Sequence, residues 1–166
     1  MIKLGNKVIV TDPCYKIDTW CNYIVNNVLV GEYNTLIKTF DGGSWGERVK
    51  ELIVLHKDYR EPDDAEIEYQ WKPVSDNIGV DSGQCGVYDL SYRCKTSDNW
   101  IHNSEFYKKA CKCTDKDEQY GEQDNAGVTS RTGFGDGTYT LFLLENPVGA
   151  VKVVGFRIVY HFDDEE

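Results

Sequence analysis

The chain of 166 residues carries 18 lysines and arginines against 28 aspartates and glutamates, a formal net charge of −10. This balance argues against a broad basic face that binds a nucleic-acid backbone. Hydrophobic residues make up 40% of the chain and include 11 tyrosines but one methionine, which favours pleated strands over a helix bundle.

The sequence begins without an apolar leader segment, and no later stretch approaches the roughly 18 consecutive apolar residues that a membrane-spanning helix needs. We therefore expect a cytoplasmic protein that does not associate with a membrane. Six cysteines without an export signal are expected to be mostly reduced thiols.

The first predicted elements are a strand and a short helix. Residues 7–10 form a short apolar run, which predicts a strand that ends at a turn beginning near Asp12. Asp18 or Thr19 is a suitable N-cap, so the sequence predicts a short helix over about 19–26.

The next segments predict three strands. Residues 33–40 and 48–56 lie on either side of the glycine-rich segment 41–46, a pattern that is typical of a hairpin. Residues 67–71 alternate between apolar and polar side chains, which predicts a strand with one face in water.

The longest predicted helix covers residues 97–113. Ser97 or Asp98 can cap it, and its aromatic and small residues recur at helical spacing. We expect this helix to pack over a sheet.

The C-terminal part of the chain returns to strands at 138–144 and 151–162, joined by a turn at 146–149. The parity of the apolar residues changes at Gly155, which predicts a β-bulge there.

Together these elements predict an α+β fold dominated by an antiparallel sheet, arranged as a sandwich or a partly closed barrel, with one longer and one short helix. No repeat or linker divides the chain. We therefore expect a single β-rich domain over residues 1–162, followed by an acidic tail at 163–166.

Three turns combine glycine, aspartate and a nearby aromatic residue, at 11–15, 80–86 and 132–139. Glycine permits a positive φ and close approach of the backbone, and aspartate accepts hydrogen bonds from nearby amides. Such turns can frame a ligand pocket, although Asp-Gly is also a common hairpin dipeptide. The candidate ligand-binding residues are Asp12, Tyr15, Asp81, Ser82, Gln84, Asp136 and Tyr139.

The same residues leave a catalytic alternative open. If Asp81 and Asp136 converge, they could bind a divalent cation or act as an acid/base pair. Neither a calcium-loop pattern nor a hydrolase motif is present. A zinc site would need paired C-x-x-C spacing, which is absent from the four cysteines that could form it, Cys85, Cys94, Cys111 and Cys113. No catalytic residue, metal ligand or cofactor is therefore assigned.

Three motifs occur in order along the chain: D-P-C-Y at 12–15, G-V-D-S-G-Q at 79–84 and G-x-G-D-G-x-Y at 133–139. Their combination resembles a family of small bacterial and phage proteins related to the DUF4241 group, and the resemblance covers most of the chain. That group carries no established reaction, so the resemblance implies no catalytic residues. It implies a short acidic accessory protein of a phage, a prophage or a bacterium.

We therefore expect a non-enzymatic binding protein in a bacterial host cell, a counter-defence factor that sequesters a small ligand such as a nucleotide signal or blocks a host protein. A hydrolase using Asp81 and Asp136, with or without a divalent metal, is one alternative. A structural or oligomeric interaction module is the other. A nucleotide ligand would require cations close to the turns, for which the candidates are Lys16, Arg48, Arg93 and Arg131.

Overall fold

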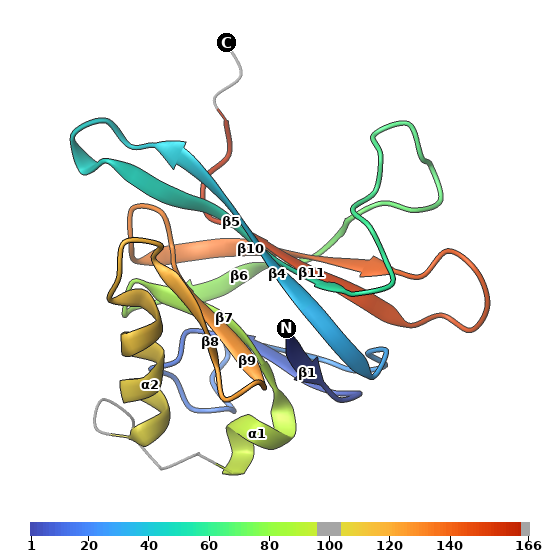
Figure 1. Cartoon of the computed structure of the whole chain (residues 1–166), viewed down its shortest axis with the longest axis horizontal. Coiled ribbons are helices and arrows are strands. Elements are labelled where there is room, and N and C mark those ends of the chain that lie inside the picture. Colours follow the sequence, from blue (N-terminus) through green and yellow to red (C-terminus); the bar gives the residue numbers. More distant parts are fainter. Residues whose placement is uncertain (96–103, 164–166) are drawn as a thin grey trace.

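The computed structural model describes residues 1–95 and 104–163. Two antiparallel sheets and two helices make up its regular structure (Figure 1). Strands account for 46% of the described residues and helices for 12%, which confirms the predicted β-dominated α+β fold. The sheets pack face to face and do not close into a barrel, so the sandwich is the correct one of the two predicted arrangements.

The larger sheet has the strand order β1-β4-β5-β11-β10-β6, and every neighbouring pair in it is antiparallel. A short 3-10 helix, Gly43–Trp45, forms the tip of the β4–β5 hairpin. The strands are β1 (Ile2–Leu4), β4 (Gly31–Asp41), β5 (Glu47–His56), β6 (Lys72–Val80), β10 (Gly137–Glu145) and β11 (Val153–Val159).

The smaller sheet has the order β3-β2-β7-β9-β8 and is also antiparallel throughout. Helix α1 (Leu90–Lys95) directly follows β7, and helix α2 (Glu105–Thr114) packs against β8 and β9. The strands are β2 (Val8–Thr11), β3 (Tyr23–Val25), β7 (Gln84–Asp89), β8 (Tyr120–Gln123) and β9 (Gly127–Arg131).

The main hydrophobic core lies between the two sheets. Alternate residues of a strand point to one face, so each sheet turns a row of apolar side chains toward the other. Leu52 and Phe156 come from the larger sheet, and Val10 and Val87 from the smaller one; all four are fully buried.

A second apolar cluster covers the outer face of the smaller sheet. Tyr88 of β7 packs edge-on against Phe106 of α2, with ring centroids 4.9 Å apart. The Tyr88 hydroxyl shares a 2.6 Å hydrogen bond with the Thr129 hydroxyl of β9. The apolar outer face of the smaller sheet is therefore the surface on which α2 packs.

The predicted bulge is confirmed beside Gly155. Leu144 pairs with Gly155, but Glu145 pairs with Val153, so Val154 is the extra residue of β11. A Cβ at Gly155 would lie 3.0 Å from the Trp71 ring, which explains the glycine. The predicted hairpin at 33–40 and 48–56 and the strand at 138–144 are also present, as β4, β5 and β10.

The predicted helix over 19–26 is wrong. Tyr23–Val25 is strand β3, which pairs with β2, and the residues before it form turns. The Asn22 side-chain amide donates to the carbonyl oxygens of Lys16 and Ile17, at 2.8 and 2.7 Å. These bonds and the pairing with β2 favour turn and strand over helix.

The predicted strand over 67–71 is also wrong. These residues belong to a loop that folds back on the outer face of the larger sheet, where Tyr69 and Trp71 join an apolar cluster that includes Ile53. The Tyr69 hydroxyl donates to the Arg60 carbonyl at 2.5 Å, whereas Ile67 is 92% exposed. The alternation therefore reflects how the loop packs, and β6 begins only at Lys72.

The predicted helix 97–113 corresponds to α2 in its C-terminal part. Ser104 is the N-cap, and its hydroxyl accepts a hydrogen bond from the Tyr107 amide. The proposed caps Ser97 and Asp98 lie outside the described residues. No helix in the described part of the chain is long and apolar enough to cross a membrane.

His56, at the end of β5, is a buried titratable residue. Its Nδ1 accepts a hydrogen bond from the Asp58 amide, and its ring stands edge-on to Tyr33. Burial lowers the pKa of His56 below its ordinary value of about 6.5, and the charge of Asp58 opposes this only in part.

We expect the free energy of unfolding to decrease as the pH falls from 7 to 5. In the unfolded chain the His56 imidazole binds a proton near pH 6.5, whereas in the folded protein it does so only at lower pH. The contribution of neutral His56 to stability is therefore complete above pH 6.5 and is lost as the pH falls below that value. Urea unfolding at several pH values measures this loss. His56→Gln should make the decrease smaller. Equal decreases in the wild type and His56→Gln would contradict the assignment.

Candidate functional site

Strand register brings the three predicted turns to one end of the sandwich. β10 begins opposite the end of β6, and β9 ends opposite the start of β7. The β6–β7 loop (81–83) and the β9–β10 loop (132–136) therefore lie side by side, on the left of Figure 1. Thr11 of β2 pairs with Gly86 of β7, which places the Asp12 turn next to them.

Asp12 is fully buried at the centre of this end of the sandwich. Its Oδ2 accepts hydrogen bonds from the Asp81 and Ser82 amides, at 2.8 and 2.7 Å. Its Oδ1 accepts from the Cys14 amide at 2.8 Å and from the Ser82 hydroxyl at 2.6 Å. These four bonds offset the unfavourable burial of a carboxylate. Asp12 thus holds the β6–β7 loop in place, and its predicted role as a direct ligand contact is replaced by a positioning role.

A cavity of about 480 Å³, here called the Asp-turn cavity, opens beside Asp12. The carboxylates of Asp81 and Asp136 line it together with the aromatic side chains of Tyr15 and Trp20. Trp20 is 79% exposed. Among the residues that the structure describes, no lysine, arginine or histidine lines this cavity. Asp81 and Asp136 therefore converge on one cavity, which their distance in the sequence could not establish.

Both carboxylates of the Asp-turn cavity are held by hydrogen bonds. The Tyr15 phenol donates to Asp81 Oδ2 at 2.5 Å, and the Gly83 amide donates to Asp136 Oδ1 at 2.9 Å. Burial raises the pKa of the Tyr15 phenol, and the hydrogen bond to Asp81 raises it further, so the phenol stays protonated. The second oxygen of each carboxylate accepts no hydrogen bond from the described residues and is available to a ligand.

One wall of the cavity forms where the 12–22 loop packs closely against β6. This close contact requires glycine at position 79 and places Trp20 at the cavity. The Gly79 amide donates to the Cys21 carbonyl at 3.0 Å, which joins the 12–22 loop to β6. A Cβ at Gly79 would lie 2.8 Å from the Cys21 Cβ, so the two segments approach this closely only with glycine. Trp20 directly precedes Cys21, which makes this contact, and Trp20 lines the cavity. Sequence reasoning missed it because it placed Trp20 inside a helix.

Two of the predicted residues belong to a different cavity. Ser82 and Gln84 line a space of about 360 Å³ next to α2, here called the α2 cavity, which Lys112 and Arg131 also line. Gln84 is buried, and its Oε1 accepts a hydrogen bond from the Thr114 hydroxyl at 2.6 Å.

Tyr139 supports the β9–β10 loop. Its hydroxyl lies 3.2 Å from the Thr132 carbonyl oxygen and 2.5 Å from that of Gly135, to which it donates. Its ring packs edge-on against Tyr160. The hydroxyl is therefore used within the loop that carries Asp136, and Tyr139 has a positioning role instead of the predicted ligand contact.

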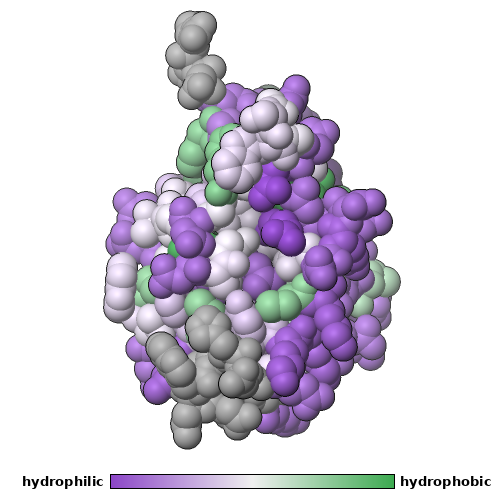
Figure 2. All heavy atoms as spheres, turned by 90° about the vertical axis from the view of Figure 1, so that its left-hand side faces the viewer, coloured by the Kyte–Doolittle hydropathy of each residue, from purple (hydrophilic) through white to green (hydrophobic). Residues whose placement is uncertain are grey.

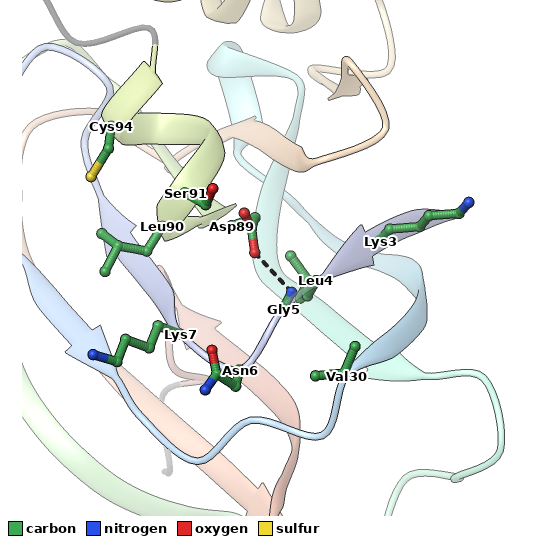
Figure 3. A pocket seen from close by; sticks show the side chains of 10 residues that line it. All are labelled: Lys3, Leu4, Gly5, Asn6, Lys7, Val30, Asp89, Leu90, Ser91 and Cys94. Atoms are coloured by element: carbon green, nitrogen blue, oxygen red, sulfur yellow. Dashed lines mark hydrogen bonds between the residues drawn. The ribbon is translucent and has the colours of Figure 1, made fainter.

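Another cavity, of about 600 Å³, lies between α1 and the β1–β2 connection, and none of the seven predicted residues lines it. Its carboxylate, Asp89, accepts a hydrogen bond from the Gly5 amide at 2.7 Å. Figure 3 shows that the side chains of Lys3 and Lys7 extend toward opposite sides. The two ammonium groups therefore do not converge on a common ligand.

The cations that a nucleotide ligand would require do not line the Asp-turn cavity. Arg48 donates to the Gly133 carbonyl, and the buried Arg93 donates to the Tyr15 carbonyl. Arg131 lines the α2 cavity. Lys16 does not line the Asp-turn cavity either. A phosphate placed between Asp81 and Asp136 would meet like charge.

Neither of the predicted metal alternatives has a donor set in the described residues. Over residues 1–95 and 104–163, no three His, Cys, Asp or Glu side chains lie together in a way that could hold a metal ion. The divalent-metal form of the hydrolase alternative and the four-cysteine zinc site therefore receive no support from the described geometry.

Comparison of the chain with protein-family models, with curated proteins and with solved structures gave no match. The resemblance to the DUF4241 group stays a prediction, and the candidate site rests on its own geometry.

Proposed function

We propose that the protein is a non-enzymatic binding protein whose Asp-turn cavity holds a cationic group, a guanidinium or an ammonium, of its ligand. The observation that carries this proposal is the pair of positioned carboxylates, Asp81 and Asp136, beside the exposed Trp20 in a cavity to which the described part of the chain contributes no basic side chain. Charge-assisted hydrogen bonds to the carboxylates and a cation–π contact with the indole would both favour such a group.

The buried Asp12 supports a binding role because it keeps the β6–β7 loop in one conformation before any ligand arrives. Loops that a rigid sheet presents in fixed positions are common binding sites, and preorganisation reduces the entropy lost on binding. Of the two targets expected from the sequence, a cationic site favours a basic side chain of a host protein over a nucleotide signal. In this proposal the protein acts in the bacterial cytoplasm and blocks a host component.

The test is an NMR titration of the ¹⁵N-labelled protein with N-acetyl-arginine methylamide. We expect shifts of the Trp20 indole N–H, assigned with Trp20→Phe, and of the Gly83 amide. The isosteric but neutral N-acetyl-citrulline methylamide should shift them much less. Asp81→Asn and Asp136→Asn should each weaken the arginine probe about 3- to 10-fold, because each removes one charge from the cavity.

Asp76→Asn is the matched control, since Asp76 is exposed on β6 but does not line the cavity. It should leave the affinity for the arginine probe unchanged. Equal responses to the arginine and citrulline probes, or full affinity in both cavity variants, would overturn the proposal.

A further inference from the structure

Four rings from three segments form a cluster, here called the aromatic platform: Phe40, Trp45, Phe134 and His161. Phe40 and His161 stack with centroids 4.0 Å apart and an interplanar angle of 6°. Phe134 stands edge-on to Phe40 at 5.2 Å and to Trp45 at 5.9 Å. The platform thus joins the β4–β5 hairpin tip, the β9–β10 loop and the residues after β11.

The outer rings of the platform are exposed although the segments that carry them are held in place. Trp45 is 65% and Phe134 52% exposed. The Arg48 guanidinium donates to the Gly133 carbonyl at 2.8 Å, next to Phe134, and Asp41 accepts from the Gly43 amide within the hairpin tip. In Figure 2, green and near-white atoms lie at the upper end of the face, with purple atoms beside and below them. Exposed aromatic clusters of this kind mark interaction surfaces.

The platform adjoins the Asp-turn cavity through one loop. Phe134 belongs to the platform and Asp136 lines the cavity, and two residue steps span at most about 7 Å. A chain segment bound at one of these features therefore reaches the other within a few residues.

Charge decides which occupant fits. Asp41 and Glu47 are exposed at the hairpin tip, and Lys50 near the platform is paired with Asp163 at 2.6 Å. These carboxylates would repel single-stranded nucleic acid and anionic membranes. A basic polypeptide is the complementary partner.

We infer that the Asp-turn cavity and the aromatic platform together bind a basic segment of a partner protein. One arginine or lysine enters the cavity, and a second lies over the faces of Trp45 and Phe134 through cation–π contacts. This inference rests on the proposed function of the cavity and adds that the ligand is a polypeptide.

The experiment is a selection of random displayed heptapeptides on the immobilised full-length protein. We expect the selected peptides to be enriched in arginine and lysine. A synthetic peptide from this pool should bind at least about 10-fold more tightly than the single-residue arginine probe, since it makes two contacts. Trp45→Ala and Phe134→Ala should each weaken the peptide about 3- to 30-fold and leave the arginine probe unaffected.

Ile67→Ala is the control, because Ile67 is an exposed apolar residue on another loop. Phe134→Leu keeps an apolar side chain and removes the ring, so it separates lost cation–π contact from a disturbed loop. A pool without basic enrichment, or peptide affinity unchanged in Trp45→Ala, Phe134→Ala and Phe134→Leu, would overturn the inference even if the arginine probe binds. Failure of the arginine probe together with full peptide affinity in Asp81→Asn and Asp136→Asn would instead overturn the proposed function.

Discussion

Replacement of Asp12 by alanine is expected to lower the free energy of unfolding by about 3 to 5 kcal/mol, because it leaves three buried or half-buried amides and the Ser82 hydroxyl without their acceptor. The amides of Cys14, Asp81 and Ser82 lose charge-assisted hydrogen bonds, and no water reaches Asp12, which is fully buried. Urea unfolding followed by circular dichroism measures the change. The amide signals of the β6–β7 loop should broaden or shift in the same variant.

Two further variants make this prediction specific. Asp12→Asn retains one carbonyl oxygen, so it should keep one pair of hydrogen bonds, and its stability should lie between those of the wild type and Asp12→Ala. Asp18→Ala removes an exposed aspartate from the same loop and should change stability by less than about 0.5 kcal/mol. If Asp12→Ala were as stable as Asp18→Ala, the positioning role of Asp12 would be wrong.

Gly86→Ala should destabilise the fold by about 3 kcal/mol through steric overlap in the middle of the smaller sheet. A Cβ at this position would lie 2.3 Å from the Tyr88 hydroxyl oxygen and 2.4 Å from the Val128 carbonyl oxygen. Neither atom can retreat freely, because Tyr88 is hydrogen-bonded to Thr129 and Val128 belongs to β9, which pairs with β7. Urea unfolding again provides the measurement.

Gly149→Ala is the control for this substitution. No atom lies within 4 Å of a Cβ at Gly149, so only its positive φ of 87° disfavours alanine, at a cost of about 1 kcal/mol. A destabilisation by Gly86→Ala no larger than that by Gly149→Ala would show that the sheet relaxes around the added methyl group.

Local patterns predicted the elements that depend on near neighbours in the chain. The β4–β5 hairpin follows from two alternating segments around a glycine-rich connection, and the bulge at Gly155 follows from a change of apolar parity. Both patterns involve residues that are close together in the chain. They could therefore be recognised in the sequence without knowledge of the sheet to which these strands belong.

Two local patterns were misleading because distant contacts outweighed them. The segment 19–26 has a suitable helix cap, but pairing of Tyr23–Val25 with β2 imposes an extended backbone. Residues 67–71 alternate like a strand, yet Tyr69 and Trp71 are packed onto the larger sheet by a loop that makes no ladder. In both cases the competing contacts involve residues of another strand or sheet.

The sequence by itself determined that this is a β-rich chain with an acidic composition and three glycine-containing turns around Asp12, Asp81 and Asp136. Only the tertiary structure decided their roles, because strand pairing joins segments that are far apart in the chain. The paired residues are more than 50 positions apart for β2 with β7 and for β6 with β10, and 39 to 47 positions apart for β7 with β9. That register buries Asp12 and leaves Asp81 and Asp136 beside Trp20. The rings of Phe134 and Trp45 meet for the same reason, since hydrogen-bonded strand pairing, not sequence distance, determines which side chains become neighbours.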